Sequence, residues 1–180
     1  MKLAAYGVGL IGLLLTGCTV MPKIEKNHLQ EPALDFFDYF HGAVEGSGFL
    51  RNWRGQITRQ FTVKMVGHYL DEAQTQLRID ESFVFNDGEA QTRIWTLTKT
   101  GGNTFTGQAN DAIGTAKGVQ LGNGVNWRYR LAIPYKGKTI EVDFDDWLYL
   151  QGDDRLLNAV KMKKFGLTVG SLFIAFDRQN

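Results

Sequence analysis

The sequence predicts an all-β domain, an antiparallel meander of about eight to ten strands that closes into a barrel, with one short N-terminal helix. Its 180 residues include 21 Gly but only 3 Pro, and Thr, Val and aromatic residues abound. That composition favours strands with tight bends. Beyond Gly42, alternating stretches are separated by Gly- and Asn-containing turns, with no crossover helix between them. A meander of this length tends to close because closure removes exposed strand edges.

The amino terminus carries the most specific signal in the chain. Lys2 precedes Leu3–Leu15, an uncharged segment too short to span a bilayer as a helix. The next residues, Leu-Thr-Gly-Cys ending at Cys18, resemble a bacterial lipobox. The alternative is a free buried Cys at the end of an apolar helix. We predict that residues 1–17 form a lipoprotein signal peptide and that Cys18 is the lipid attachment site, with an amide-linked palmitate beside its diacylglycerol.

The lipid on Cys18 predicts a location. Cys18 is the only Cys, so no internal disulfide can form and acylation accounts for the thiol. More than one acyl chain gives stable membrane anchoring. In the pattern of such lipoproteins an Asp after the Cys favours inner-membrane retention, and here the residue is Thr19. We therefore expect an outer-membrane protein that faces the periplasm and contacts the membrane through its N-terminal lipid.

The mature chain is predicted to form a tether and one domain. Residues 18–31 show no periodicity and are expected to be a lipidated tether, and residues 32–180 are expected to be the barrel domain. Within it, Pro32–Phe40 predicts a short amphipathic helix, with Pro32 at its first position. The predicted strands are 43–51, 54–70, 75–85, 91–99, 104–109, 113–121, 125–135, 139–150, 156–163 and 167–177. Residues 153–164 also fit a helix face.

The turn Lys136-Gly137 predicts a register for its hairpin. With a loop of even length, the numbers of opposing residues sum to 273, which places Ile133 opposite Ile140, Leu131 opposite Val142 and Tyr129 opposite Phe144. The other face then pairs Arg130 with Asp143 and Arg128 with Asp145, and places Glu141 opposite Ala132. Opposite charges across a strand pair stabilise it, so these carboxylates read as a solvated charge ladder.

Two features suggest a ligand site. Asp146 falls on the apolar face beside Trp127, where a carboxyl needs a hydrogen-bond or Arg partner. Small residues in 113–121 leave room above the strand for a bulky side chain or a ligand, and packing is the simpler interpretation. The ligand-binding residues that we predict are Trp95, Gly114, Ala116, Gly118, Trp127, Phe144 and Asp146.

Other site classes find no support in the sequence. Lys and Arg number 20 against 19 Asp and Glu, which argues against nucleic acid as a partner. His28, His41 and His68 lack metal-ligand spacing, so we expect neither a metal nor a cofactor. No nucleophile elbow, Cys-His pair or phosphate-binding loop appears, so we predict no catalytic residues and expect a protein that is not an enzyme.

Five stretches together carry a family resemblance: YFHGAVEGSGFLRNWRG, FVFNDGEAQTRIWTLTKTG, NDAIGTAKG, NWRYRLAIP and VDFDDWLYLQGDD. Between about Phe36 and Phe176 the chain resembles an uncharacterised family of proteobacterial lipoproteins, a domain of unknown function. The resemblance implies an envelope lipoprotein with a lipocalin-like barrel, and it implies no activity or substrate.

The leading hypothesis is an outer-membrane-anchored barrel that binds a lipophilic small molecule or lipid. A second is a structural or interaction module of the cell envelope that docks on a protein partner and has no small ligand. A third is a hydrolytic enzyme that uses Asp146 or Asp111.

Overall fold

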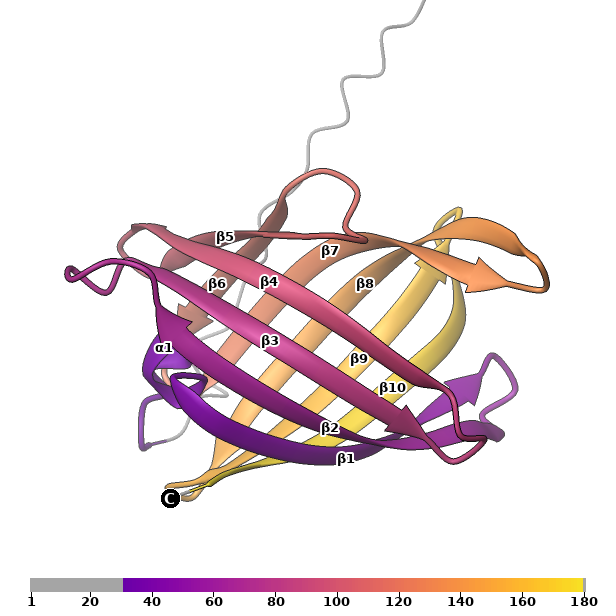
Figure 1. Ribbon diagram of the computed structural model, residues 1–180, viewed down its shortest axis with the longest axis horizontal. Helices are drawn as coiled ribbons and strands as arrows, with labels where there is room; N and C mark the ends of the chain where they lie inside the picture. Colours follow the sequence, from indigo (N-terminus) through magenta and orange to yellow (C-terminus); the bar gives the residue numbers. More distant parts are fainter. Residues whose placement is uncertain (1–30, 180) are drawn as a thin grey trace, which may run out of the picture.

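The computed structural model describes residues 31–179 and shows a closed barrel of ten antiparallel strands with one short helix (Figure 1). Neighbouring strands in the sequence pair throughout, and β1 pairs with β10 to close the sheet. The predicted all-β barrel is therefore confirmed. The predicted signal peptide and lipid site, and the predicted tether up to residue 30, lie outside the described residues. The elements are α1 Phe36–Tyr39, β1 Gly42–Asn52, β2 Ile57–Tyr69, β3 Gln76–Phe85, β4 Ala90–Gly101, β5 Thr104–Ala109, β6 Ala116–Leu121, β7 Gly124–Tyr135, β8 Lys138–Gln151, β9 Arg155–Lys164 and β10 Leu167–Arg178.

Alternating side chains define the inside and the outside of the barrel. In β2, Phe61, Val63 and Met65 are buried in the interior, whereas Thr62 and Lys64 between them are exposed. This is the period of two that a half-buried strand requires. The core consequently lies inside the barrel. No helix of residues 31–179 has the length and apolar character needed to cross a membrane.

The predicted register of the β7–β8 hairpin is confirmed at every pair. Tyr129 lies opposite Phe144 and Leu131 opposite Val142, and the charged face turns outward. Arg130 Nε lies 2.7 Å from Asp143 Oδ1, and both side chains are nearly half exposed. The ladder continues onto β9, where Lys163 Nζ lies 3.0 Å from Asp145 Oδ2. Because the Arg130–Asp143 pair is solvated, it sets the register more than it adds stability.

The predicted helix Pro32–Phe40 is too long. Helix α1 begins only at Phe36, because the carboxylate of Asp35 caps it by accepting the N–H groups of Phe37 and Asp38, both at 3.0 Å. Before the cap, the N–H of Leu34 donates to the carbonyl of Gly122 in the β6–β7 turn, at 2.9 Å. This tertiary hydrogen bond holds the preceding backbone out of the helix, so Pro32 does not open it.

Helix α1 closes one end of the barrel, at the same end as the C-terminus (Figure 1). Phe36 stacks on Phe105 with ring centroids 5.0 Å apart, and Phe40 meets Phe176 edge to face at 5.7 Å. On β2, a side chain at Gly67 would overlap the carbonyl oxygen of Phe40, so only Gly lets the backbone after α1 lie against that strand. The aromatic stripe of the helix is thus a plug.

Two further sequence predictions are settled by backbone pairing. Residues 155–164 form strand β9, paired with β8 and β10, so the helical interpretation of that stretch is wrong. The strand predicted at 113–121 begins only at Ala116. Before it, Ala112 bridges to Leu131 and the N–H of Ile113 donates to the carbonyl of Arg130, which carries the segment over to β7. Gly114 then turns with a φ of 74° and lies outside the strand.

Candidate functional site

The barrel encloses a cavity of about 910 Å³. Helix α1 and an aromatic floor close it at one end, and at the other it opens between the hairpins β1–β2, β7–β8 and β9–β10. Apolar side chains line most of the wall, and a belt of polar groups crosses it between floor and mouth. The polar belt consists of Glu81, Arg93, Asp111, Tyr129, Asp146 and Asn158.

The floor is built from packed aromatic rings. Trp127 stacks on Phe105, with centroids 4.8 Å apart and planes at 14°, and meets Trp95 edge to face at 5.5 Å. These rings occupy the space that small residues leave free: a Cβ at Gly118 would overlap the ring of Phe105, and one at Gly107 would lie 2.6 Å from Trp127. The small residues of this strand therefore leave room for bulky aromatic side chains, as the packing interpretation predicts.

The sequence-predicted ligand residues separate into two groups. Trp95, Trp127, Phe144 and Asp146 all line the cavity. Ala116 and Gly118 lie on β6 and do not line it, because Phe105 and Trp127 cover that strand, and Gly114 sits in the preceding loop. The cavity thus brings together four of the predicted residues and leaves the three small ones outside its wall.

An ion pair anchors one side of the polar belt. Arg93, on β4, contacts both carboxylate oxygens of Asp111 through Nε at 3.0 Å and donates from Nη2 to Oδ2 at 2.9 Å. Across the strand pair, Arg93 Nη1 lies 3.5 Å from Glu81 Oε2, at the limit of a hydrogen bond. Asp111 thus makes most of the hydrogen bonds to the guanidinium of Arg93, and Glu81 makes only one weak contact with it.

Burial, opposed only in part by Arg93, sets the protonation of Glu81. Burial in the barrel raises its pKa to about 7, and the attraction of Arg93 offsets the burial only in part. Burial alone would lower the pKa of Arg93, but the neighbouring Glu81 and Asp111 raise it, so Arg93 stays charged. At mildly acidic pH Glu81 is therefore a neutral acid that can donate a hydrogen bond into the cavity.

Asp146 occupies the opposite side of the polar belt, and the prediction that it points inward is confirmed. Its partners are neutral: the hydroxyl of Tyr129 donates to Oδ2 at 3.1 Å, and Nδ2 of Asn158 donates to Oδ1. Burial raises the pKa of Asp146 to about 7, although both hydrogen bonds lower it. Burial and the nearby Asp146 also hold the pKa of Tyr129 well above its usual value.

The polar belt therefore contains three carboxyl groups and only one guanidinium group. Asp111 neutralises Arg93, which leaves Glu81 and Asp146 as acids in an apolar chamber. Such groups donate hydrogen bonds when protonated and attract a basic group when ionised. Within residues 31–179, no group of three His, Cys, Asp or Glu side chains is arranged to hold a metal ion.

The hydrolytic interpretation required Asp146 or Asp111 to face a pocket, and both line the cavity. Their oxygens are nevertheless engaged. Arg93 contacts both oxygens of Asp111, and Tyr129 and Asn158 each occupy one oxygen of Asp146.

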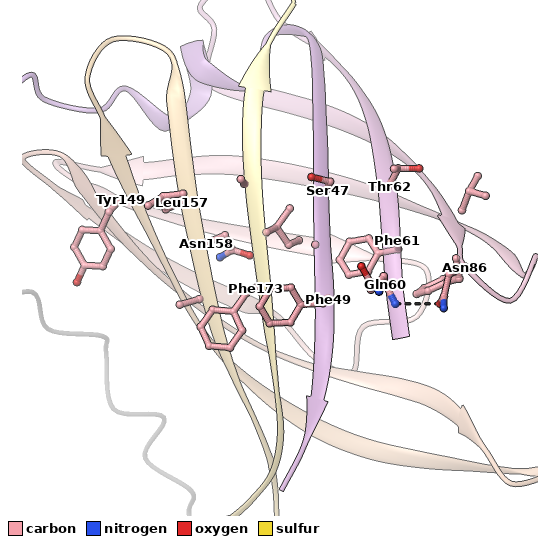
Figure 2. Close-up of a pocket in the computed structure, with 16 residues that line it drawn as sticks. Ser47, Phe49, Gln60, Phe61, Thr62, Asn86, Tyr149, Leu157, Asn158 and Phe173 are labelled. Carbon is pink, nitrogen blue, oxygen red and sulfur yellow. Dashed lines mark hydrogen bonds between the residues drawn. The ribbon is translucent and has the colours of Figure 1, made fainter. Parts of the chain in front are cut away.

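A second hollow lies on the outer wall, where a groove of about 830 Å³ crosses β10 and β1 (Figure 2). Phe49 and Phe173 stack there with centroids 5.3 Å apart, and Tyr149 and Leu157 line the groove farther along. No acidic or basic side chain lines this groove among the described residues. It offers an apolar contact surface without the titratable groups of the interior.

Trp127→Ala tests the aromatic floor. We expect the free energy of unfolding to fall by about 3 kcal/mol, because a large buried side chain is lost beside an existing cavity. Trp147→Ala is the matched control, since Trp147 faces outward on β8, half-buried and stacked on Tyr149. Urea denaturation of both variants checks the prediction, and losses of equal size would contradict it.

Solved structures of other proteins align with this chain. An S-type phycobiliprotein lyase, CPES from Guillardia theta, aligns with a TM-score of 0.57 at 10% identity, covering 81% of this chain and 91% of that one. A redesigned β-barrel aligns with a TM-score of 0.42 at 13% identity, covering 80% and 95%. The structure of EF1p2_mFAP2b bound to DFHBI aligns with a TM-score of 0.42 at 10% identity, covering 79% of this chain and 95% of that one.

At 10% identity, the likeness to the lyase shows a shared barrel fold and nothing about activity. No curated protein matches the chain. Residues 12–178, nearly the whole sequence, match the family described as "Protein of unknown function (DUF3833)". The chain therefore belongs to the DUF3833 family.

Proposed function

We propose that the protein is a proteobacterial outer-membrane lipoprotein, anchored through Cys18 and facing the periplasm, whose barrel binds a lipophilic small molecule or lipid. The observation that carries the proposal is the cavity of about 910 Å³, apolar on most of its wall and open at one end. A volume of this size lies in the range of sites that enclose small ligands. The lipobox-like sequence ending at Cys18 supports the anchor.

The polar belt defines the chemistry of the ligand. Apolar side chains on both sides of it accept a hydrocarbon or aromatic body, with the cations Arg51, Arg59 and Lys164 nearer the mouth, and Glu81 and Asp146 meet a polar group at the belt. Because both acids have a pKa near 7, they can pair with a basic nitrogen or donate to a carbonyl. The ligand is therefore amphipathic, with its polar group away from its end.

The ligand is tested by mass spectrometry of the full chain, purified from membranes in mild detergent and then extracted with solvent. We expect a stoichiometric small molecule in the wild type and its loss in Ile140→Trp, which fills the cavity mouth. Glu141→Trp is the matched control, since the next residue faces outward. An extract that is identical for wild type and Ile140→Trp would reject the proposal.

A second candidate function is docking on an envelope protein partner, which the outer groove favours because it is apolar and lies outside the barrel. Crosslinking in cells distinguishes it. A partner captured through Phe173→Cys, with no cargo in the extract, would replace the carrier proposal by the docking one.

A further inference from the structure

Three hairpins around the mouth of the barrel present the same pair of side chains. Each places an exposed aromatic ring at its tip, with a cation directly beside it in the sequence and over its face. The pairs are Trp53 with Arg54 at 4.6 Å, Tyr135 with Lys136 at 5.4 Å and Phe165 with Lys164 at 4.8 Å. We call these three pairs the aromatic rim.

None of the rings of the aromatic rim is core. Trp53 is 69% exposed, Tyr135 54% and Phe165 90%. Ile57 and Leu167, at the bases of two of the hairpins, are also more than half exposed. Scattered exposed apolar residues are ordinary, but here they gather on one end of the molecule. That end is also where the cavity opens.

The turns at the two ends of the barrel differ in charge. At the mouth, Arg54, Lys136, Lys138 and Lys164 form no ion pair with any side chain of residues 31–179. The acids of the β3–β4 hairpin at this end, Asp87 and Glu89, are both bound by Arg59 at 2.7 and 2.9 Å. The closed end instead carries acidic turns, Asp71-Glu72 in β2–β3 and Asp153-Asp154 in β8–β9. The mouth therefore presents free positive charge.

We propose that the aromatic rim docks on an anionic lipid surface, so that the cavity opens onto the bilayer. Aromatic side chains favour the headgroup level of a membrane, and Lys and Arg beside them attract anionic phosphates. The three pairs of aromatic ring and cation match such a surface in both polarity and charge. This docking goes beyond anchoring and cargo binding, because it requires neither a lipid on Cys18 nor a bound ligand.

Fluorescence quenching tests the docking on the full chain in vesicles that contain brominated lipid. Subtracting the spectrum of Trp53→Phe from that of the wild type isolates the emission of Trp53. In vesicles with about one third phosphatidylglycerol, we expect that emission to shift to shorter wavelength and to lose at least half its intensity. The emission of Trp147, isolated in the same way with Trp147→Phe, is the control and should be unchanged, because Trp147 lies on the wall of β8.

The charge requirement is tested with Arg54→Gln, Lys136→Gln and Lys164→Gln combined. Each cation near an anionic surface contributes about fivefold in binding, so the triple variant should lose on the order of 100-fold and leave Trp53 unquenched. Lys64→Gln, on the wall and 78% exposed, should quench like the wild type. Purely zwitterionic vesicles should mimic the triple variant.

Equal quenching of Trp53 in anionic and zwitterionic vesicles would overturn the proposal, as would an unquenched Trp53 in both. In the second case, sedimentation that shows a dimer abolished by Trp53→Ser would assign the rim to a second copy of the chain. Trp53 also lines the cavity mouth, but the quencher is carried by the lipid, so its quenching reports contact with the bilayer whether or not a cargo is found.

Discussion

At pH 8, the variant Arg93→Leu is expected to lose about 3 to 5 kcal/mol of its free energy of unfolding. Arg93 is the only cation of the polar belt, and its removal leaves the buried Glu81 and the half-buried Asp111 without a counter-charge. A buried charge without a partner is far more costly than a missing surface pair. The loss should be smaller at pH 5, because Glu81 is then largely neutral. Urea denaturation at both pH values measures it.

The next ion pair on the same hairpin is the control. Arg78 lies 2.8 Å from Asp80 on the outer face, where both side chains are 39% exposed, so Arg78→Leu should change stability much less. Adding Glu81→Gln and Asp111→Asn to Arg93→Leu should recover most of the loss, because no charge then remains to be buried. Equal losses for the two Arg variants would show that Arg93 acts only through packing.

Stability should fall as the pH rises from 4 to 7, opposite to the usual behaviour of acidic groups. Asp146 has a pKa of about 7 when folded against 3.8 when exposed, so in this window the folded state binds the extra proton. The unfolded chain releases this proton over that window while the folded chain keeps it, so folding costs about 1.4 kcal/mol more per pH unit, on the order of 4 kcal/mol in all. Glu81 adds a similar trend between 4.5 and about 7.

Asp146→Asn should flatten this pH profile while keeping both hydrogen bonds, since an amide oxygen accepts from Asn158 and its N–H₂ can donate to Tyr129. Asp145→Asn is the matched control. The hydrogen bond from Lys163 helps hold the pKa of Asp145 below its usual value despite partial burial, so its contribution is lost only below about pH 4. A wild-type profile that rises between pH 4 and 7 would contradict the assignment of Asp146 as a neutral acid.

The β7–β8 hairpin was predictable because two independent patterns agree on one register. Apolar residues match across one face and opposite charges across the other, and a shift of one residue would break both sets. Asp146 could be placed inside by the same count, since it falls opposite Trp127. Where only one pattern is present, as in the small residues before β6, the strand boundary was missed by three residues.

Part of the polar belt could also have been found from the sequence. Glu81 follows Leu77 and Ile79 at every second position, and a turn centred on Asp87 places it opposite Arg93. Asp111 is different, because it reaches Arg93 from the β5–β6 loop, where no alternation applies. The free volume of the cavity was also beyond prediction, since it depends on how far the rings of the floor and plug fill a barrel of ten strands.

The pairing of β1 with β10 has a consequence for how the molecule is made. This seam joins residue 44 to residue 178, so the ends of the domain meet only after the last strand has been synthesised. Until then the sheet has two open edges, and its interior is exposed to the surroundings. Contacts so distant in sequence form slowly. The wall of the barrel therefore closes only once β10 is in place, and a chain truncated before β10 would have no closed barrel.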